Sequence, residues 1–300
     1  MPRKKLNYDS RILLLTTGGQ DYMQDDLLCG FRTVFGKRAV DFPRKDILYM
    51  DFEGNVHPRP EYAMNARYFV TDDVDRTEDI DPKNFDFVIN LSCRRNNGLA
   101  DIYIDGEDDE VVRSPYPGGI LFKRELPELG PGMKVHPITF GLPDHLAPLM
   151  PSSGLFSAKK VEVHSSFTVE HGPNRRRLAA TWPVEKHRTR AEYVSALNEA
   201  RFVLSPKGAG WDCQRHYEIL GRAVPVIEVN DDAPAHFKEM WRDGENCLTF
   251  WEDPAIIQDK IAAVTPRQWD DMVMCGYKEL YDKYLATAVA WTVLERAGVL

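Results

Sequence analysis

The feature that most constrains this fold is a series of short apolar runs without clean polar–apolar alternation. In the first half of the chain they lie at residues 12–17, 47–50, 85–91, 102–104 and 135–140. Between the first two runs, apolar residues recur at helical spacing from 21 to 35. Strands buried on both faces are apolar throughout, and helices between them cover those faces. The pattern predicts a mostly parallel sheet.

A second set of elements follows an uncharged segment rich in Pro, Ser and Gly at 148–157. Strands are predicted at 161–167, 201–204 and 223–229, and helices at 190–200, from Cys213 with Asp212 as N-cap, at 254–264 and at 269–297. We therefore predict an α/β protein with two Rossmann-like domains, residues 1–152 and 153–300, facing each other across a cleft. The final helix is a candidate to cross back to the first domain.

Composition excludes several classes of protein. No apolar run approaches the roughly 20 residues of a membrane helix, and no secretory pattern opens the chain. The five cysteines have no metal or redox spacing, so we expect reduced thiols and a cytoplasmic protein. A net charge of −8 argues against a nucleic-acid partner. The basic stretch 175–190 is either a solvated surface or an anion site.

The chemistry concentrates in residues 201–227, predicted as strand, glycine-rich loop, helix and strand. Gly208 and Gly210 allow the backbone to approach a ligand closely. A helix that starts after the loop directs its free N–H groups at it, which favours a phosphate. Lys207 and Arg215 add positive charge. The segment is therefore a candidate phosphate site.

Arg215 and Glu218 lie three residues apart, on one face of that helix. A carboxylate one turn into the helix can accept hydrogen bonds from ribose hydroxyls while phosphates lie at the helix start. The arrangement suits a nucleotide diphosphate. The alternative is a glycine turn followed by a surface Arg–Glu pair. Trp211 either stacks on a base or sugar or packs the loop against the body.

The segment SPKGAGWDCQRHYEILGRAVPVI resembles the donor-binding segment of exostosin-like and related GT-B glycosyltransferases. The shared pattern is Ser/Cys-Pro, a glycine loop, Arg-x-x-Glu, a small-residue turn and Pro-Val-Ile. The resemblance implies a nucleotide-sugar donor, such as a UDP- or GDP-sugar, and a glycan acceptor. It implies no required cofactor. It assigns the pyrophosphate to Arg215 and the ribose to Glu218, within a donor site of Ser205, Lys207, Gly208, Gly210, Arg215 and Glu218.

Transfer of a sugar with inversion needs a base for the acceptor hydroxyl. Asp21 follows the glycine turn after the first strand, where a doubly wound domain binds ligands, so it is the first candidate. The alternative for Asp21 is a helix N-cap. Asp108, in the acidic segment 105–109, is the second candidate, and a solvated acidic loop is its alternative.

The same acidic segment has the oxygen ligands that Mg²⁺ or Mn²⁺ prefers. The proposed phosphate loop lies in the other half of the chain, and GT-B enzymes generally need no catalytic metal. We therefore expect no bound ion.

The sequence thus predicts a glycosyltransferase that moves a sugar from a nucleotide diphosphate sugar to a hydroxyl. Three other functions stay open. They are a nucleotide-sugar epimerase of GT-B fold, a non-catalytic nucleotide-binding module, and a phage-type transferase that glycosylates DNA bases.

Overall fold

The computed structural model shows an α/β protein with two parallel sheets. It describes residues 5–19, 21–49, 73–74, 80–95, 97–112, 118–128, 135–152, 154–171, 173–251 and 253–300. The chain divides into two compact units. Unit 1 is Met1–His145 with Lys283–Leu300, and unit 2 is Leu146–Asp282. The division lies just before the predicted boundary at 152, and the last 18 residues, 283–300, are counted with unit 1.

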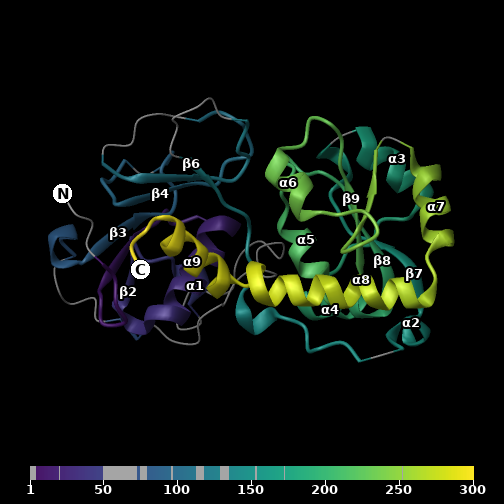
Figure 1. Cartoon of the computed structure of the whole chain (residues 1–300), viewed down its shortest axis with the longest axis horizontal. Coiled ribbons are helices and arrows are strands. Elements are labelled where there is room, and N and C mark those ends of the chain that lie inside the picture. The colour runs from purple at the N-terminus through teal and green to yellow at the C-terminus, as the bar shows by residue number, and fades with distance from the viewer. Residues whose placement is uncertain are drawn as a thin grey trace. The chain divides into compact units, whose positions relative to one another are not determined.

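Unit 1 is built on a six-stranded sheet in the order β2-β1-β3-β4-β5-β6 (Figure 1). Every neighbouring pair is parallel. The strands are β1 (Ile12–Leu15), β2 (Ala39–Phe42), β3 (Phe87–Asn90), β4 (Ile102–Asp105), β5 (Ile120–Lys123) and β6 (Val135–Pro137). The fully buried β1, β3 and β4 confirm the parallel sheet that the apolar runs predict.

One predicted strand of unit 1 is wrong. Residues 46–48 form the 3₁₀ helix η2 (Asp46–Leu48), and Met50 lies outside the described residues. Two strands, β2 and β5, have no counterpart in the prediction. Each contains a buried charged residue, Asp41 in β2 and Lys123 in β5, which shortens its apolar run.

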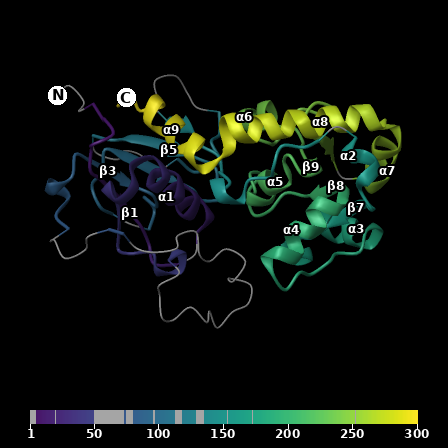
Figure 2. The same ribbon diagram turned by 90° about the horizontal axis from the view of Figure 1, so that it is seen from below.

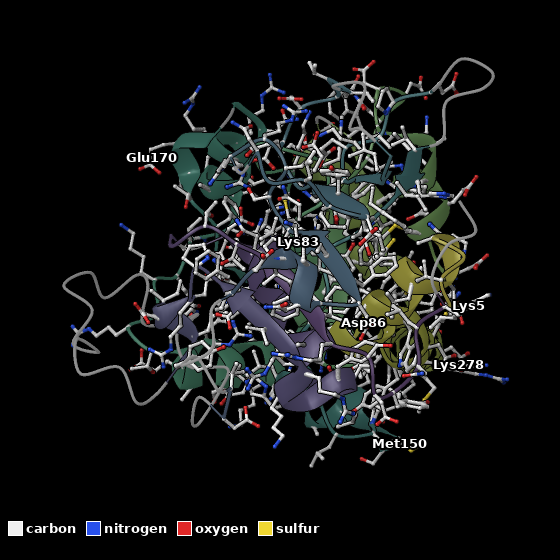
Figure 3. All side chains as sticks on the ribbon, turned by 90° about the vertical axis from the view of Figure 1, so that its left-hand side faces the viewer. Lys5, Lys83, Asp86, Met150, Glu170 and Lys278 are labelled. Atoms are coloured by element: carbon white, nitrogen blue, oxygen red, sulfur yellow. The ribbon has the colours of Figure 1, made fainter. Side chains whose placement is uncertain are left out.

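The C-terminal helix completes unit 1. Helix α9 (Ala286–Arg296) packs along α1 (Tyr22–Phe35) (Figures 1 and 2). The two helices meet closely at Gly30, where an added Cβ would lie 2.1 Å from the carbonyl oxygen of Ala286. Beyond α9, the backbone N–H of Leu6 donates to the carbonyl of Val299 at 2.7 Å. Figure 3 shows Lys5 beside this last segment, and its Nζ donates to the carbonyl of Leu300.

A hydrogen bond joins the amino ends of two central strands of unit 1, β1 and β3. Asp86, labelled with Lys83 in Figure 3, immediately precedes β3. Its carboxylate accepts a hydrogen bond of 3.0 Å from the backbone N–H of Arg11, which precedes β1. The bond aligns the starts of two parallel neighbours.

Unit 2 carries a four-stranded parallel sheet in the order β10-β9-β8-β7. Its strands are β7 (Val161–Ser165), β8 (Ala200–Ser205), β9 (Val224–Glu228) and β10 (Leu248–Phe250). Its helices are α2 (Leu155–Ala158), α3 (Pro173–Thr181), α4 (Arg190–Glu199), α5 (Gln214–Ile219), α6 (Ala235–Met240), α7 (Pro254–Ala263) and α8 (Pro266–Glu279). Apolar residues of β8, β9 and β10 pack against α7 and α8 around the buried ring of Trp269.

Two predicted helices, the one from Cys213 and the one at 269–297, differ in the structure, and β10, α2, α3 and α6 have no counterpart in the prediction. Helix α5 starts at Gln214 with Cys213 as N-cap, because the carboxylate of Asp212 accepts a 2.6 Å bond from the Tyr217 hydroxyl instead. The predicted helix 269–297 is interrupted by the π-helical turn η7 (Leu280–Tyr284).

Among the described residues, no helix is both long and apolar enough to cross a membrane.

Candidate functional site

The glycine loop 206–213 leaves the carboxyl end of β8 and leads into α5 (Figure 1). The backbone N–H of Gly208 donates to the carbonyl of Gly210 at 3.0 Å, which closes a tight turn. A Cβ on Gly208 would lie 2.8 Å from the sulfur of Cys213. A side chain at this position would therefore displace the Cys213 side chain, a packing constraint that the sequence pattern did not reveal.

Arg215 connects the ends of β7 and β8. Its Nε donates to the hydroxyl of Ser205 at 3.1 Å. Its Nη1 and Nη2 donate to the carbonyls of Ser166 and Pro206 at 3.2 and 3.1 Å. A guanidinium has five N–H groups, so these three bonds fix its plane and leave N–H groups for a further acceptor.

Arg175, on α3, is a second cation behind the same loop. Its Nε donates to the carbonyl of Lys207 at 2.8 Å and its Nη1 to the carbonyl of Thr168 at 2.9 Å. The residue is only 6% exposed. Burial, and then the like charge of Arg215, lower the pKa of Arg175 to about 10. The sequence placed it only within a basic stretch, because nothing in that run distinguishes a buried arginine from exposed ones.

Glu228, at the end of β9, holds the loop from the other side. One carboxylate oxygen accepts from the backbone N–H of Lys207 at 3.1 Å, and the other accepts from the amide of Asn174 at 2.8 Å. The ammonium of Lys207 lies 3.9 Å from the centre of the Trp211 ring. Trp211 is buried against Phe237, so it packs the loop against the body of unit 2.

Ser205 and His216 belong to a chain of buried hydrogen bonds. The Ser205 hydroxyl lies 2.6 Å from Nδ1 of His216, and Nε2 of His216 lies 3.0 Å from the carbonyl of Trp211. A carbonyl only accepts, so Nε2 carries the proton and Nδ1 accepts from Ser205. Burial lowers the pKa of His216 to about 3, which keeps the ring neutral. Ser205 is therefore committed to internal bonds as well as to Arg215.

Glu218 lies on α5 but faces α4 rather than the glycine loop. Its carboxylate accepts from the hydroxyl of Tyr193 at 2.9 Å and forms an ion pair with Arg190. Arg190 is the first residue of α4, whose start is fixed by a capping box of Thr189 and Glu192. The structure thus ties the predicted ribose ligand to two side chains that the sequence did not single out.

In unit 1, Asp21 is the N-cap of α1, as the alternative interpretation expected. Its carboxylate accepts from the backbone N–H of Gln24 at 3.2 Å and from the Gln24 amide at 2.8 Å. Arg95, in the loop after β3, lies 3.8 Å away. The catalytic role of Asp21 stays a prediction.

The acidic segment after β4 is largely exposed, and its carboxylates are paired with cations. Arg94 bonds Asp105 at 2.8 Å and Asp109 at 2.5 Å, which lowers the pKa of Asp109 to about 2. Asp108 is 51% exposed and forms an ion pair with Arg124. Arg95 pairs with the remaining carboxylate, Glu107, and Lys123 is a second cation beside Asp105. These cations come from the β3 loop and from the end of β5.

A different group of side chains has the spacing of metal ligands. Among the described residues, His164, Glu185 and His187 each offer one donor atom within 4.8 Å of the other two. All three belong to unit 2.

This chain matches no protein-family model, and a search of curated proteins also produced no match.

Proposed function

We propose that this protein is a glycosyltransferase of GT-B type that binds a nucleotide diphosphate sugar on unit 2. The observation that carries the proposal is the pair of guanidinium groups, Arg175 and Arg215, behind the glycine loop. They lie at the carboxyl ends of β7 and β8, and ligands of parallel α/β sheets bind at that edge.

The electrostatics favour an anion at this loop. Burial lowers the pKa of Arg175 most, and the positive charge of Arg215 lowers it further, so the two cations disfavour each other when no anion is bound. A diphosphate would relieve that repulsion, and the ammonium of Lys207 lies on the same loop to add to it. Arg215 has N–H groups beyond its three internal bonds for a phosphate oxygen.

The nucleoside would extend from the loop toward Glu218. Each oxygen of this carboxylate accepts one bond, from Arg190 or from Tyr193, and a carboxylate oxygen has two lone pairs. Ribose hydroxyls can therefore donate to the same carboxylate without breaking its internal bonds.

Unit 1 would bind the acceptor, whose hydroxyl we take to belong to a glycan. The sheet order places β2 and β3 on opposite sides of β1, so the topological switch point lies between β1 and β3. Asp21 follows β1 and Arg95 follows β3, and their side chains meet there. We propose that Asp21, or failing that Asp108, takes the hydroxyl proton as the oxygen bonds to the anomeric carbon and the nucleotide diphosphate leaves.

Binding tests the first half of this proposal. UDP, GDP, CMP, dTDP and inorganic pyrophosphate would be titrated into wild type and into Arg215→Ala. Arg176→Ala is the matched control, because Arg176 is an exposed arginine of α3. A diphosphate nucleotide should bind wild type and the control alike. The proposal would be overturned if none of these five anions bound to the wild-type protein.

A second candidate is a nucleotide-binding module without catalysis. The observation that favours it is that both candidate bases are engaged: Asp21 caps α1, and Asp108 pairs with Arg124. Tight nucleotide binding without turnover, across a panel of donors and glycan acceptors, would select this function. An epimerase would instead change the sugar of the donor without any acceptor.

A further inference from the structure

Two histidines and a glutamate of unit 2 converge beside β7. His164 lies on β7, and Glu185 and His187 lie in the segment between α3 and α4. The two Nε2 atoms of the histidines are 3.3 Å apart. A carboxylate oxygen of Glu185 lies 3.6 Å from Nδ1, on the other edge of the His164 ring.

The segment that carries Glu185 and His187 is fixed to the strand. The backbone N–H of Glu185 donates to the carbonyl of Ser165 at 2.9 Å. The hydroxyl of Ser165 donates back to the carbonyl of Pro183 at 2.6 Å. Two residues after His187, Thr189 caps α4. The backbone therefore presents the two side chains from anchored positions.

The exposures of the three side chains suit a site at the surface. His164 is buried on β7, so its ring is held in place beside the surface. His187 is half-buried, and the Glu185 carboxylate is 58% exposed. Solvent can thus reach the remaining coordination position, and a carboxylate oxygen of Glu185 lies within 4.8 Å of a donor atom of each histidine.

We propose that His164, His187 and Glu185 bind one divalent transition-metal ion of the zinc class. Two ligands at about 2.0–2.1 Å from a tetrahedral ion lie about 3.3–3.4 Å apart, which is the spacing of the two Nε2 atoms. Two imidazoles and one carboxylate favour Zn²⁺ and its neighbours over Mg²⁺ or Ca²⁺, which take oxygen ligands. Water would complete the coordination.

This site departs from the expectation that no ion is bound. The sequence separates His164 from the other two residues by more than 20 positions, so no local spacing indicates it. The fold brings them together because β7 and the segment before α4 lie side by side.

The ion would have a positioning role. The His187 and Tyr193 rings are 5.7 Å apart, and the Tyr193 hydroxyl donates to Glu218. An ion at His187 would therefore fix the start of α4 against β7 and hold Tyr193 and Arg190 at Glu218. This role rests on the proposed function of Glu218, whereas binding of the ion does not.

The test uses untagged full-length protein stripped with a chelator and then titrated with Zn²⁺ alone. We expect about one Zn²⁺ per chain and a rise of several degrees in melting temperature. Co²⁺ at the same site should give the visible absorption of a tetrahedral ion. His187→Gln and Glu185→Gln should each weaken Zn²⁺ binding at least 10-fold, while His145→Gln, an exposed histidine of unit 1, should leave it unchanged.

Circular dichroism of the variants separates loss of ligation from loss of fold. Wild-type protein that binds no Zn²⁺ would overturn the proposal. Zn²⁺ binding that survives both His187→Gln and Glu185→Gln in folded protein would place the ion elsewhere and overturn it too. Loss in His187→Gln alone would remove Glu185 from the ligands and contradict the three-residue site. None of these results depends on nucleotide binding, so they are separable from a failure of the proposed transferase.

Discussion

The hydroxyl oxygen of Ser205 lies 2.6 Å from Nδ1 of His216, and both side chains are completely buried. The bond needs a neutral imidazole, because a protonated ring has no acceptor nitrogen. Burial lowers the pKa of His216 from 6.5 to about 3. Segment 201–227 is thus held together by an imidazole ring that cannot be charged without disrupting this bond.

Acid should therefore destabilise the protein through His216. In the unfolded chain His216 binds a proton near pH 6.5, whereas in the folded state it does so near pH 3. Its contribution to the free energy of unfolding is thus complete above pH 6.5 and is lost as the pH falls toward 3, by about 1.4 kcal/mol per pH unit. Urea unfolding between pH 7.5 and 4.5 should show a shallower dependence in His216→Gln. Exposed His145→Gln is the control, and equal slopes in wild type and His216→Gln would contradict the assignment.

A buried ion pair under the first glycine turn should be costly to break. Nζ of Lys45 lies 2.6 Å from Oδ1 of Asp25, with both side chains inaccessible, and also donates to the carbonyl of Gly19. Lys45→Met should lower the free energy of unfolding at pH 7.5 by about 3–5 kcal/mol, since it leaves a buried carboxylate without its cation. Burial already raises the pKa of Asp25 to about 6, so the loss should be smaller at pH 5, where the carboxyl can be protonated.

Two further variants test that explanation. The double variant Asp25→Leu with Lys45→Met should recover most of the stability, because it removes both charges. Lys37→Met, at an exposed lysine of unit 1, should change little. A double variant as unstable as Lys45→Met alone would show that packing, and not charge, explains the loss.

Arg215→Ala should weaken binding of a nucleotide diphosphate by about 1.5–3 kcal/mol, the range for hydrogen bonds to charged groups. Isothermal titration against wild type and Arg176→Ala measures it. Because Arg215 also bridges Ser166 and Pro206, the melting temperature of each variant must be recorded. Unchanged affinity in a folded Arg215→Ala protein would remove Arg215 from the site.

Glu218→Gln should distinguish binding of the nucleoside from binding of the phosphates. If Glu218 binds ribose, the variant should lose about 10-fold in affinity for the nucleotide diphosphate and nothing for inorganic pyrophosphate. Arg215→Ala should lose affinity for both ligands. Equal losses of both ligands in Glu218→Gln would mean that the Arg190–Glu218 pair acts through the fold of unit 2 and not on ribose.

Asp21→Asn distinguishes a base from a cap. Asn caps helices about as well as Asp, so the melting temperature should hardly change. If Asp21 deprotonates the acceptor, turnover should fall by about 10²–10⁴-fold with donor affinity retained. Turnover would be measured with saturating donor. Near-normal turnover in Asp21→Asn would show that Asp21 is not the catalytic base. Asp108→Asn would then be tested in the same way.

The sequence predicts those parts of the fold whose signal is local. Buried strands such as β1 and β8 are continuous apolar runs, so they are visible without tertiary information. Strand β5 was missed because its last residue, Lys123, is buried by pairing with Asp105, a partner 18 positions away. Local pattern cannot show such pairing.

The same limit applies to the candidate site. The glycine loop and Arg215 could be identified from their spacing, and both lie at the carboxyl end of β8. The roles of Arg175 and Glu228 could not, since each reaches the loop from a different element. The orientation of Glu218 toward α4 likewise depends on Arg190 and Tyr193, which no spacing rule connects to it.

The contact of Gly30 with Ala286 bears on how the protein is made. Helix α1 is covered by α9, which is separated from it by the whole of unit 2. A ribosome delivers the chain from its amino end, so unit 2 can fold while α1 still lacks its cover. Unit 1 can reach its final structure only after α9 has left the exit tunnel. A released chain truncated after residue 282 should therefore bind chaperones through unit 1, because α1 then lacks the helix that covers it.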